Sequence, residues 1–185
     1  MQLVDRMVGA ARLNAQTYEE VEADASATGQ AMLVVVLSSV GAAIGAAHHS
    51  GGGGLLVATV ASLLGWVAWA ALMYFVGTRV LPEPQTRADL GELLRTTGFA
   101  SAPGVLAALG VVPEFDVAIR LVVALWMLVA GVVAVRQALD YESTGRAIVV
   151  CGIGWVAYAL TVFVLVNALL AVTFGLGVTL EGDGC

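Results

Sequence analysis

Long apolar runs alternate with short polar connections along most of this chain. Four runs are continuous enough to predict transmembrane helices, over about residues 31–48, 55–78, 117–136 and 147–175. Each run approaches or exceeds the ~20 residues that a helix needs to cross ~30 Å of hydrocarbon. The pattern therefore predicts a polytopic membrane protein.

A fifth apolar segment, residues 96–112, is short and contains Gly98, Pro103 and Gly104. As a helix of about 17 residues it would span only ~25 Å, so it either crosses as a short kinked span or dips in and returns. If it crosses, and the N-terminus is cytoplasmic, seven arginines lie inside and Arg120 alone lies outside; a re-entrant segment makes the count six to two. Because cytoplasmic connections are enriched in arginine, we predict the crossing.

The expected fold is therefore all-α, a polytopic transmembrane five-helix bundle over residues 31–180. The N-terminus would be cytoplasmic and the C-terminus external. The last apolar run continues to residue 180, but we expect its helix to end near Gly175 and Gly177, so that residues 181–185 form a short external tail. Arg120 lies so near the start of its span that its side chain could reach the interface without a buried partner.

Residues 1–30 precede the first long apolar run and form a separate cytoplasmic helical segment. Apolar residues recur at helical spacing over residues 3–13, which predicts a short amphipathic helix lying on the membrane surface.

A second helix follows in the same segment. Thr17 and Glu20 have the spacing of a capping box, and Tyr18 and Val21 would share one face of the helix. That helix either packs through this face or is only a solvated lead-in to the first span.

Composition supports the membrane assignment and narrows the function. Hydrophobic residues make up 59% of the chain and charged residues only 12%, about half the proportion in soluble domains. No charged side chain falls near the middle of a predicted span, where transporters and proton relays usually place one. The same absence disfavours an intramembrane enzyme, so we expect no catalytic residue. No basic patch indicates a nucleic-acid partner.

The sequence also indicates no metal or cofactor. Cys151 and Cys185 have no metal-binding spacing. His48 and His49 are adjacent, so on a helix their side chains would diverge by ~100°, and we interpret them as a polar interfacial end of the first span.

Two features predict helix packing within the membrane. Gly41 and Gly45 form a small-xxx-small pair, which lets another helix approach closely, whether from this chain or from a partner. Asn167 lies in the last span, and its amide would be costly to expose to lipid, so we expect it to face protein.

The order of segments resembles a known family. A stretch "RMVGAARLNAQTYEEVEADASATGQA" leads into the first span, "RTTGFASAPGVLAAL" forms the third segment, and "ALDYESTGRAIVV" enters the last span. In this arrangement the chain resembles the bacterial branch of the Yip family, five-span membrane proteins named for eukaryotic members that interact with Ypt/Rab GTPases.

The resemblance implies a five-span fold and gives a structural interpretation of four residues. Gly98, Pro103, Gly104 and Gly145 match the family pattern, and we interpret them as shaping the backbone. Eukaryotic relatives act in vesicle trafficking, but this chain has a very short N-terminal region and a bacterium has no Rab to bind. We therefore do not carry the trafficking role over.

The function expected from all of this is non-catalytic. The chain would be an integral protein of a bacterial inner membrane that organises membrane or serves as a small subunit of a larger complex, with the lipid bilayer and other membrane proteins, or itself, as partners. Arginines of the N-terminal segment and the connections are the candidate contacts to a partner or to anionic lipid: Arg6, Arg12, Arg87, Arg95, Arg136 and Arg146.

The alternative is a channel or permease for a small neutral solute. Its path would be lined by the polar side chains of the spans, namely Ser38, Thr59, Ser62, Thr161 and Asn167. These side chains should then converge on one cavity.

Overall fold

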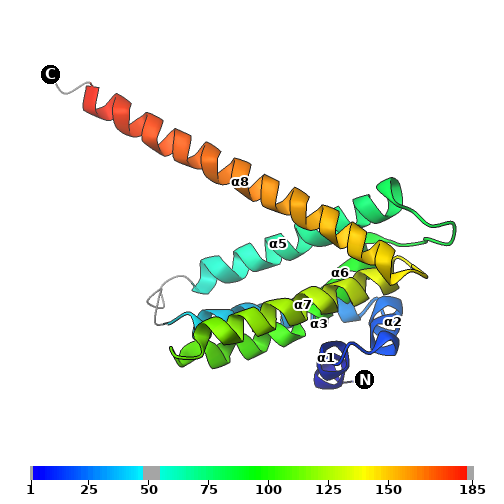
Figure 1. Ribbon diagram of the computed structural model, residues 1–185. Helices are drawn as coiled ribbons and strands as arrows, with labels where there is room; N and C mark the ends of the chain where they lie inside the picture. Colours follow the sequence, from blue (N-terminus) through cyan, green and yellow to red (C-terminus); the bar gives the residue numbers. More distant parts are fainter. Residues whose placement is uncertain (1, 48–54, 183–185) are drawn as a thin grey trace.

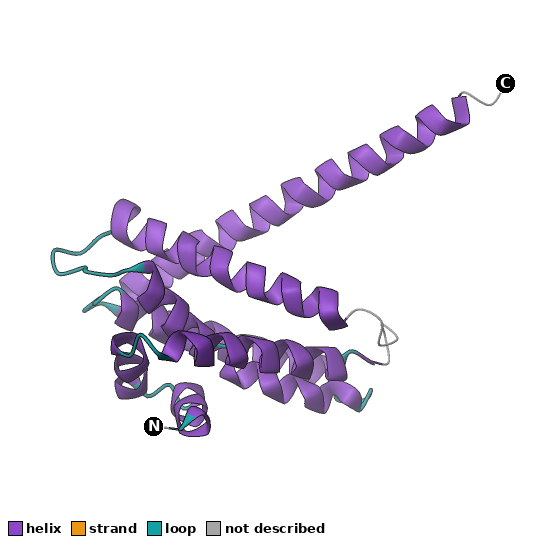
Figure 2. Ribbon diagram, turned by 180° about the vertical axis from the view of Figure 1, so that it is seen from behind, coloured by secondary structure: helices purple, strands orange, loops and turns teal. Residues whose placement is uncertain are grey.

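The computed structural model describes residues 2–47 and 55–182, and throughout these residues the regular structure is helical (Figures 1 and 2). His48 and His49 lie outside the described residues. In chain order the elements are α1 (Leu3–Ala11), α2 (Ala15–Ala23), α3 (Ala27–Gly45), α5 (Leu55–Phe75), the π-helix η1 (Val76–Val80), α6 (Leu90–Ala100), the 3₁₀ helix η2 (Ala102–Val111), α7 (Asp116–Ala138) and α8 (Thr144–Gly182).

Four stretches of helix are long and apolar enough to cross a membrane: Ala27–Gly45, Leu55–Val80, Asp116–Ala138 and Thr144–Thr161. The predicted all-helical membrane fold is therefore confirmed. The first stretch begins four residues before the predicted start at residue 31. The second extends beyond residue 78 because a π-helical turn continues α5 to Val80.

The third segment differs from its prediction in both length and geometry. Its helix begins at Leu90, six residues before residue 96, because Asp89 starts it with a capping box. The backbone N–H of Glu92 donates to Asp89 Oδ1 at 2.8 Å, and the N–H of Asp89 donates to Glu92 Oε2 at 2.7 Å. Together α6 and η2 extend over roughly 36 Å, at 1.5 Å per α-helical residue and 2.0 Å per 3₁₀ residue.

The same segment forms the centre of the bundle. α6 and η2 pack against both α3 and α7, and α6 also packs against α5 and α2. Pro103 lies at the start of η2, where its missing N–H breaks no hydrogen bond of the helix. A short segment with glycines and a proline is thus the most enclosed part of the bundle.

α5 and α8 form the edge of the molecule. They contact each other near the end where α8 begins, where the rings of Trp69 and Trp155 lie 5.4 Å apart, and then diverge (Figure 1). Only 6% of the apolar window of α5 is buried, against 33% of that of α3. About half of the α5 residues are exposed in the described part of the chain.

The end of α8 does not follow the prediction. The helix continues through residues 175 and 177 to Gly182. Asn167, expected to face protein, is exposed, and its Nδ2 donates to the carbonyl oxygen of Phe163 on the same helix at 2.7 Å. A bond to the carbonyl four residues earlier satisfies the amide locally, which removes the need for a second helix.

The N-terminal segment is packed into the fold. α2 contacts α6 and α7, and α1 contacts α2, α6 and η2. Tyr18 and Val21 are fully buried, which excludes the solvated lead-in. The predicted cap at Thr17 is wrong, because the helix begins at Ala15, where the Asn14 side chain accepts from the N–H of Gln16 at 3.0 Å. Asn is among the strongest N-cap residues, and Thr17 lies inside the helix.

Candidate functional site

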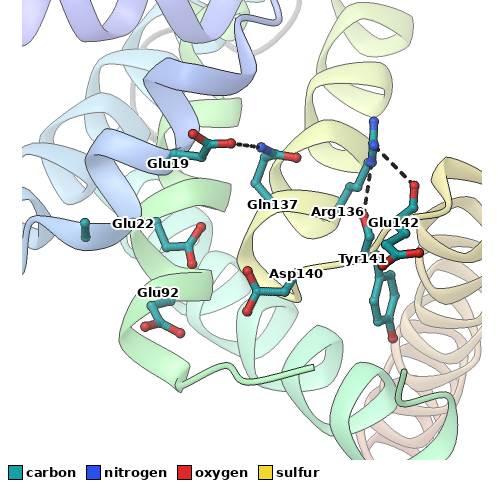
Figure 3. Close-up of a pocket in the computed structure, with 9 residues that line it drawn as sticks. Glu19, Glu22, Glu92, Arg136, Gln137, Asp140, Tyr141 and Glu142 are labelled. Atoms are coloured by element: carbon teal, nitrogen blue, oxygen red, sulfur yellow. Dashed lines mark hydrogen bonds between the residues drawn. The ribbon is translucent and has the colours of Figure 1, made fainter. Parts of the chain in front are cut away.

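One end of the bundle gathers α2, residues 81–89 and residues 139–143. We call it the arginine-rich end, since it carries Arg79, Arg87, Arg95, Arg136 and Arg146. Figure 3 shows its central cavity, of about 440 Å³. The lining comes from α2, α6, the last turns of α7 and the connection after it: Glu19, Glu22, Ala23, Glu92, Arg136, Gln137, Asp140, Tyr141 and Glu142.

Tyr141 joins two connections at this end. Its hydroxyl lies within hydrogen-bonding distance of the carbonyl oxygens of Gly77, at 3.0 Å, and Leu81, at 2.7 Å. Both carbonyls belong to the π-helical turn and the residue after it, where the widened backbone leaves oxygens for side-chain donors. Gly77 packs tightly against the buried side chain of Leu139, because a Cβ there would lie 2.3 Å from Leu139 Cδ1.

Arg146 also joins the two connections, and Arg136 holds the second of them against the end of α7. Arg146 Nε lies 3.2 Å from Glu83 Oε1, and Arg146 Nη1 donates to the carbonyl of Pro82 at 2.9 Å. Arg136 Nε donates to the carbonyl of Tyr141 at 3.2 Å. Two arginines expected to contact a partner or lipid therefore also have bonds within the chain.

Arg95 fixes the C-terminus of α2. Arg95 is only 8% exposed, and its Nε donates to the carbonyls of Val21 at 3.1 Å and Glu22 at 2.9 Å. The last carbonyls of a helix lack intrahelical donors and carry partial negative charge, so a cation there is stabilising. Arg95 is thus used inside the protein, and the same holds for Arg6.

Arg6 is 7% exposed and links α1 to the start of α3. Its Nη2 lies 2.6 Å from Asp24 Oδ2, and its Nη1 donates to Gln30 Oε1 at 2.9 Å. Hydrogen bonds from Ser26 and Arg6 lower the pKa of Asp24 to about 2. At the other end of α1, Trp126 of α7 donates its indole N–H to the carbonyl of Ala11 at 2.7 Å.

The carboxylates of the cavity face one another with little neutralisation. Glu22 of α2, Glu92 of α6 and Asp140 after α7 point toward the same space in Figure 3. Burial and the neighbouring carboxylates, Glu92 first and Asp140 next, raise the pKa of Glu22 to about 7, against a lowering influence of Arg95. The cavity is therefore acidic, and Glu22 titrates near neutrality.

A second region of close contact is the seam between α3 and the third segment. A Cβ at Gly41 would lie 2.7 Å from the carbonyl oxygen of Val105, and one at Gly45 would lie 2.1 Å from that of Ala107. A Cβ at Gly104 would lie 1.9 Å from Ser38 Oγ, and one at Gly98 would lie 2.7 Å from Ala31 Cβ. The helix that approaches the glycine pair is thus η2 of the same chain.

Gly145 has no such contact, because the nearest atom to its added Cβ is Ser143 Oγ at 3.4 Å, an ordinary distance. Arg12 and Arg87 are exposed, and their side chains form no hydrogen bond or ion pair with the residues that the structure describes. They are the two of the six arginines whose charge stays available to a partner or to lipid.

An ion pair that was not predicted from the sequence lies at the opposite end of the bundle. The side chain of Asp116 is 3% exposed and forms an ion pair with Arg120 one turn along α7. Arg120, expected to need no buried partner, therefore has one. Asp116 is buried beside Gly110 of η2, so the pair also lies against the third segment.

The polar side chains proposed for a solute path do not converge. Ser38 lies against Gly104, whereas Thr59 lies 3.2 Å from Ser39 at the contact of α3 and α5. Thr161, like Asn167, bonds a carbonyl of its own turn on exposed α8. Within the described residues, no three or more His, Cys, Asp and Glu side chains are arranged to hold a metal ion.

A family model, the Yip1 domain, matches residues 13–166. The chain belongs to the Yip1 domain family. The match covers α2 through the first half of α8, so it includes the seam between α3 and η2 and most of the arginine-rich end. No curated protein and no solved structure matches this Yip1 domain.

Membership confirms the resemblance to the Yip family, whereas the bacterial branch and the five spans stay predictions. The structure shows what the three quoted stretches do. Gly98 and Gly104 allow close contact with α3, and Tyr141 joins two connections. The roles of Trp126 and Asp116 were not foreseen. The sequence offered two signals for these roles: the indole of Trp126 in the middle of a predicted span, and the spacing of Asp116 and Arg120 by one helical turn.

Proposed function

We propose that this Yip1 domain is a non-catalytic integral membrane protein that organises membrane or serves as a small subunit of a larger membrane complex. The observation that carries the proposal is the exposure of α5, of whose apolar window only 6% is buried. Leu56, Leu64 and Val67 are between 43% and 77% exposed. Without a hydrophobic drive between helices, lipid or another helix can cover such a face equally well. Small residues near Leu64, namely Ala61, Gly65 and Ala68, favour a helix.

α8 carries a second exposed apolar surface. Its exposed apolar side chains include Val156, Leu160 and Phe163, and Figure 2 shows the helix continuing away from α5. The partner surface of the proposal is therefore the outer face of α5 together with this part of α8. The contacting protein would be another membrane protein or a second copy of the chain.

The test is site-specific photo-crosslinking in native membranes. A crosslinker at Leu64 or Phe163 should capture one defined protein band, which mass spectrometry then identifies as this chain or another. The matched control is Leu121 on α7, which is 60% exposed but outside the proposed surface. Capture of lipid only at all three positions, or the same band at Leu121, contradicts the proposal.

We also propose that the third segment crosses the bilayer, giving five spans in a bacterial inner membrane with a cytoplasmic N-terminus and an external C-terminus. In support, α6 and η2 together are long enough for ~30 Å of hydrocarbon. Their two ends also lie near opposite charged ends of the bundle, Glu92 at the acidic cavity and Gly110 beside Asp116.

A further inference from the structure

The docked position of α2 is held by polar contacts as well as by apolar packing. Arg95 binds its last carbonyls, and Gln137 Nε2 donates to Glu19 Oε1 at 2.9 Å. Beneath it, Tyr18 and Val21 are fully buried in a cluster with Phe99 of α6. A helix of nine residues is unstable alone in water, so α2 keeps its structure only while it lies on the bundle.

Carboxylates of α2, α6 and the connection after α7 meet at this docking interface. Glu22 and Glu19 belong to α2, Glu92 to α6, and Asp140 and Glu142 to the connection after α7. Carboxylates that line one cavity repel one another, and partial burial strengthens the repulsion. Docking therefore brings together charges that separate when α2 moves away.

The cations at this interface are directed elsewhere. Arg95 of α6 donates to backbone carbonyls, and Arg136 of α7 donates to the carbonyls of Tyr141 and Glu142. Arg6 of α1 is paired with Asp24 and Gln30. Arg95 still attracts Glu22 through space, but the neighbouring carboxylates and burial outweigh it.

We propose that α2 forms a proton-sensitive flap, closed on the arginine-rich end when Glu22 is protonated and opening more readily when all the facing carboxylates are charged. Protonation removes one charge from the cluster. The Glu22 side chain forms no hydrogen bond with the described residues, so its protonation breaks none. The flap covers Phe99 and its apolar neighbours, so opening exposes a surface that is otherwise sealed. The device thus couples proton concentration to the exposure of that surface.

The direction of the effect follows from the two pKa values of Glu22. The pKa is about 7 in the docked state and 4.5 in an open, solvated one. A group whose pKa is raised by docking stabilises the docked state fully below 4.5, and that stabilisation is lost as pH rises through about 7. Between pH 8 and pH 5.5 the docking equilibrium should shift toward the closed state by roughly 30-fold, and by less at high salt.

Hydrogen exchange measures this equilibrium even when the closed state dominates. The full chain in lipid nanodiscs is compared at pH 5.5 and pH 8, and protection factors are corrected for the intrinsic pH dependence of exchange. Amides of α2 should be roughly 30-fold more protected at the lower pH, whereas those of α7 should change little. Equal protection of α2 at both pH values overturns the proposal.

Three variants identify the group responsible. Glu22→Gln should hold α2 at high protection and remove its pH dependence, and Glu92→Gln, which keeps the capping box, should move the midpoint to lower pH. Glu20→Gln is the matched control on the same helix, because Glu20 does not line the cavity; it should behave as the unmodified chain. A full pH response that persists in Glu22→Gln overturns the assignment.

Discussion

At Gly45, a single added methyl group would stand 2.1 Å from the backbone carbonyl oxygen of Ala107. A flexible side chain could move away from that methyl, but a carbonyl inside a helix cannot move without its neighbours. The narrow 3₁₀ backbone of η2 therefore packs so closely against the glycines of α3 that there is no room for one added methyl group. By contrast, an added Cβ at Gly131 of α7 would meet no atom within 4 Å.

These two glycines make a matched pair of substitutions. Gly45→Ala should destabilise the bundle by about 1–3 kcal/mol, the usual cost of overpacking a close contact. Gly131→Ala should be neutral or slightly stabilising, because alanine is the better helix former by about 1 kcal/mol. Unfolding in mixed micelles at increasing SDS fraction measures both. Equal midpoints for the two variants would show that the seam is looser than described.

Tyr141 offers a second test at single residues. Tyr141→Phe removes the hydroxyl between the carbonyls of Gly77 and Leu81, and it should destabilise the joined connections by about 1–2 kcal/mol. Cleavage by a protease within residues 81–89 should become faster. Tyr158→Phe, on exposed α8, is the control and should leave the cleavage rate unchanged. Unchanged cleavage in both would mean that the hydroxyl contributes nothing to this connection.

Among elements, the sequence predicted most where the apolar pattern was long and least where short segments fold against the bundle. α3, α5 and α7 lie within a few residues of their predicted bounds. The position of α2 could not be predicted, because it depends on Arg95, more than seventy residues away in the chain. The acidic cavity has the same origin, since its carboxylates come from three separate stretches.

Arg95 supplies the prediction at this scale. Arg95→Lys keeps the charge but replaces a fork of donors by a single ammonium, so the carbonyls of Val21 and Glu22 can no longer both be held in the same way. Protection of α2 amides against hydrogen exchange should fall by about 10-fold at pH 7, which corresponds to 1.4 kcal/mol. Arg87→Lys, in the exposed connection, should cause no change. A similar loss in both variants would assign the effect to general charge placement.

At the scale of the whole molecule, the third segment decides whether the two charged ends of the bundle lie on opposite sides of the membrane. Its glycines and Pro103 suggested a kink in a marginal span, and the structure resolves them into an α-helix followed by a 3₁₀ helix, packed between α3 and α7. The length expected from sequence was marginal because it assumed an α-helix throughout, whereas a 3₁₀ helix advances further per residue. The longer rise of η2 and the earlier start of α6 at Leu90 together bring the segment above the ~30 Å of the hydrocarbon core.

The crossing can be tested with single cysteines placed on either side of the third segment. In a background with Cys151→Ser and Cys185→Ser, Arg87→Cys and Glu114→Cys each introduce one thiol at an exposed position. If the segment crosses, a membrane-impermeant maleimide should label Glu114→Cys only in right-side-out vesicles and Arg87→Cys only in inside-out vesicles. Labelling of both thiols in the same vesicle orientation would show that the segment dips in and returns, and that α7 and α8 run in the opposite direction across the bilayer. Because the bonds of Tyr141 and Arg146 tie the connection before α6 to the one after α7, the result for residue 87 also assigns the side of the acidic cavity.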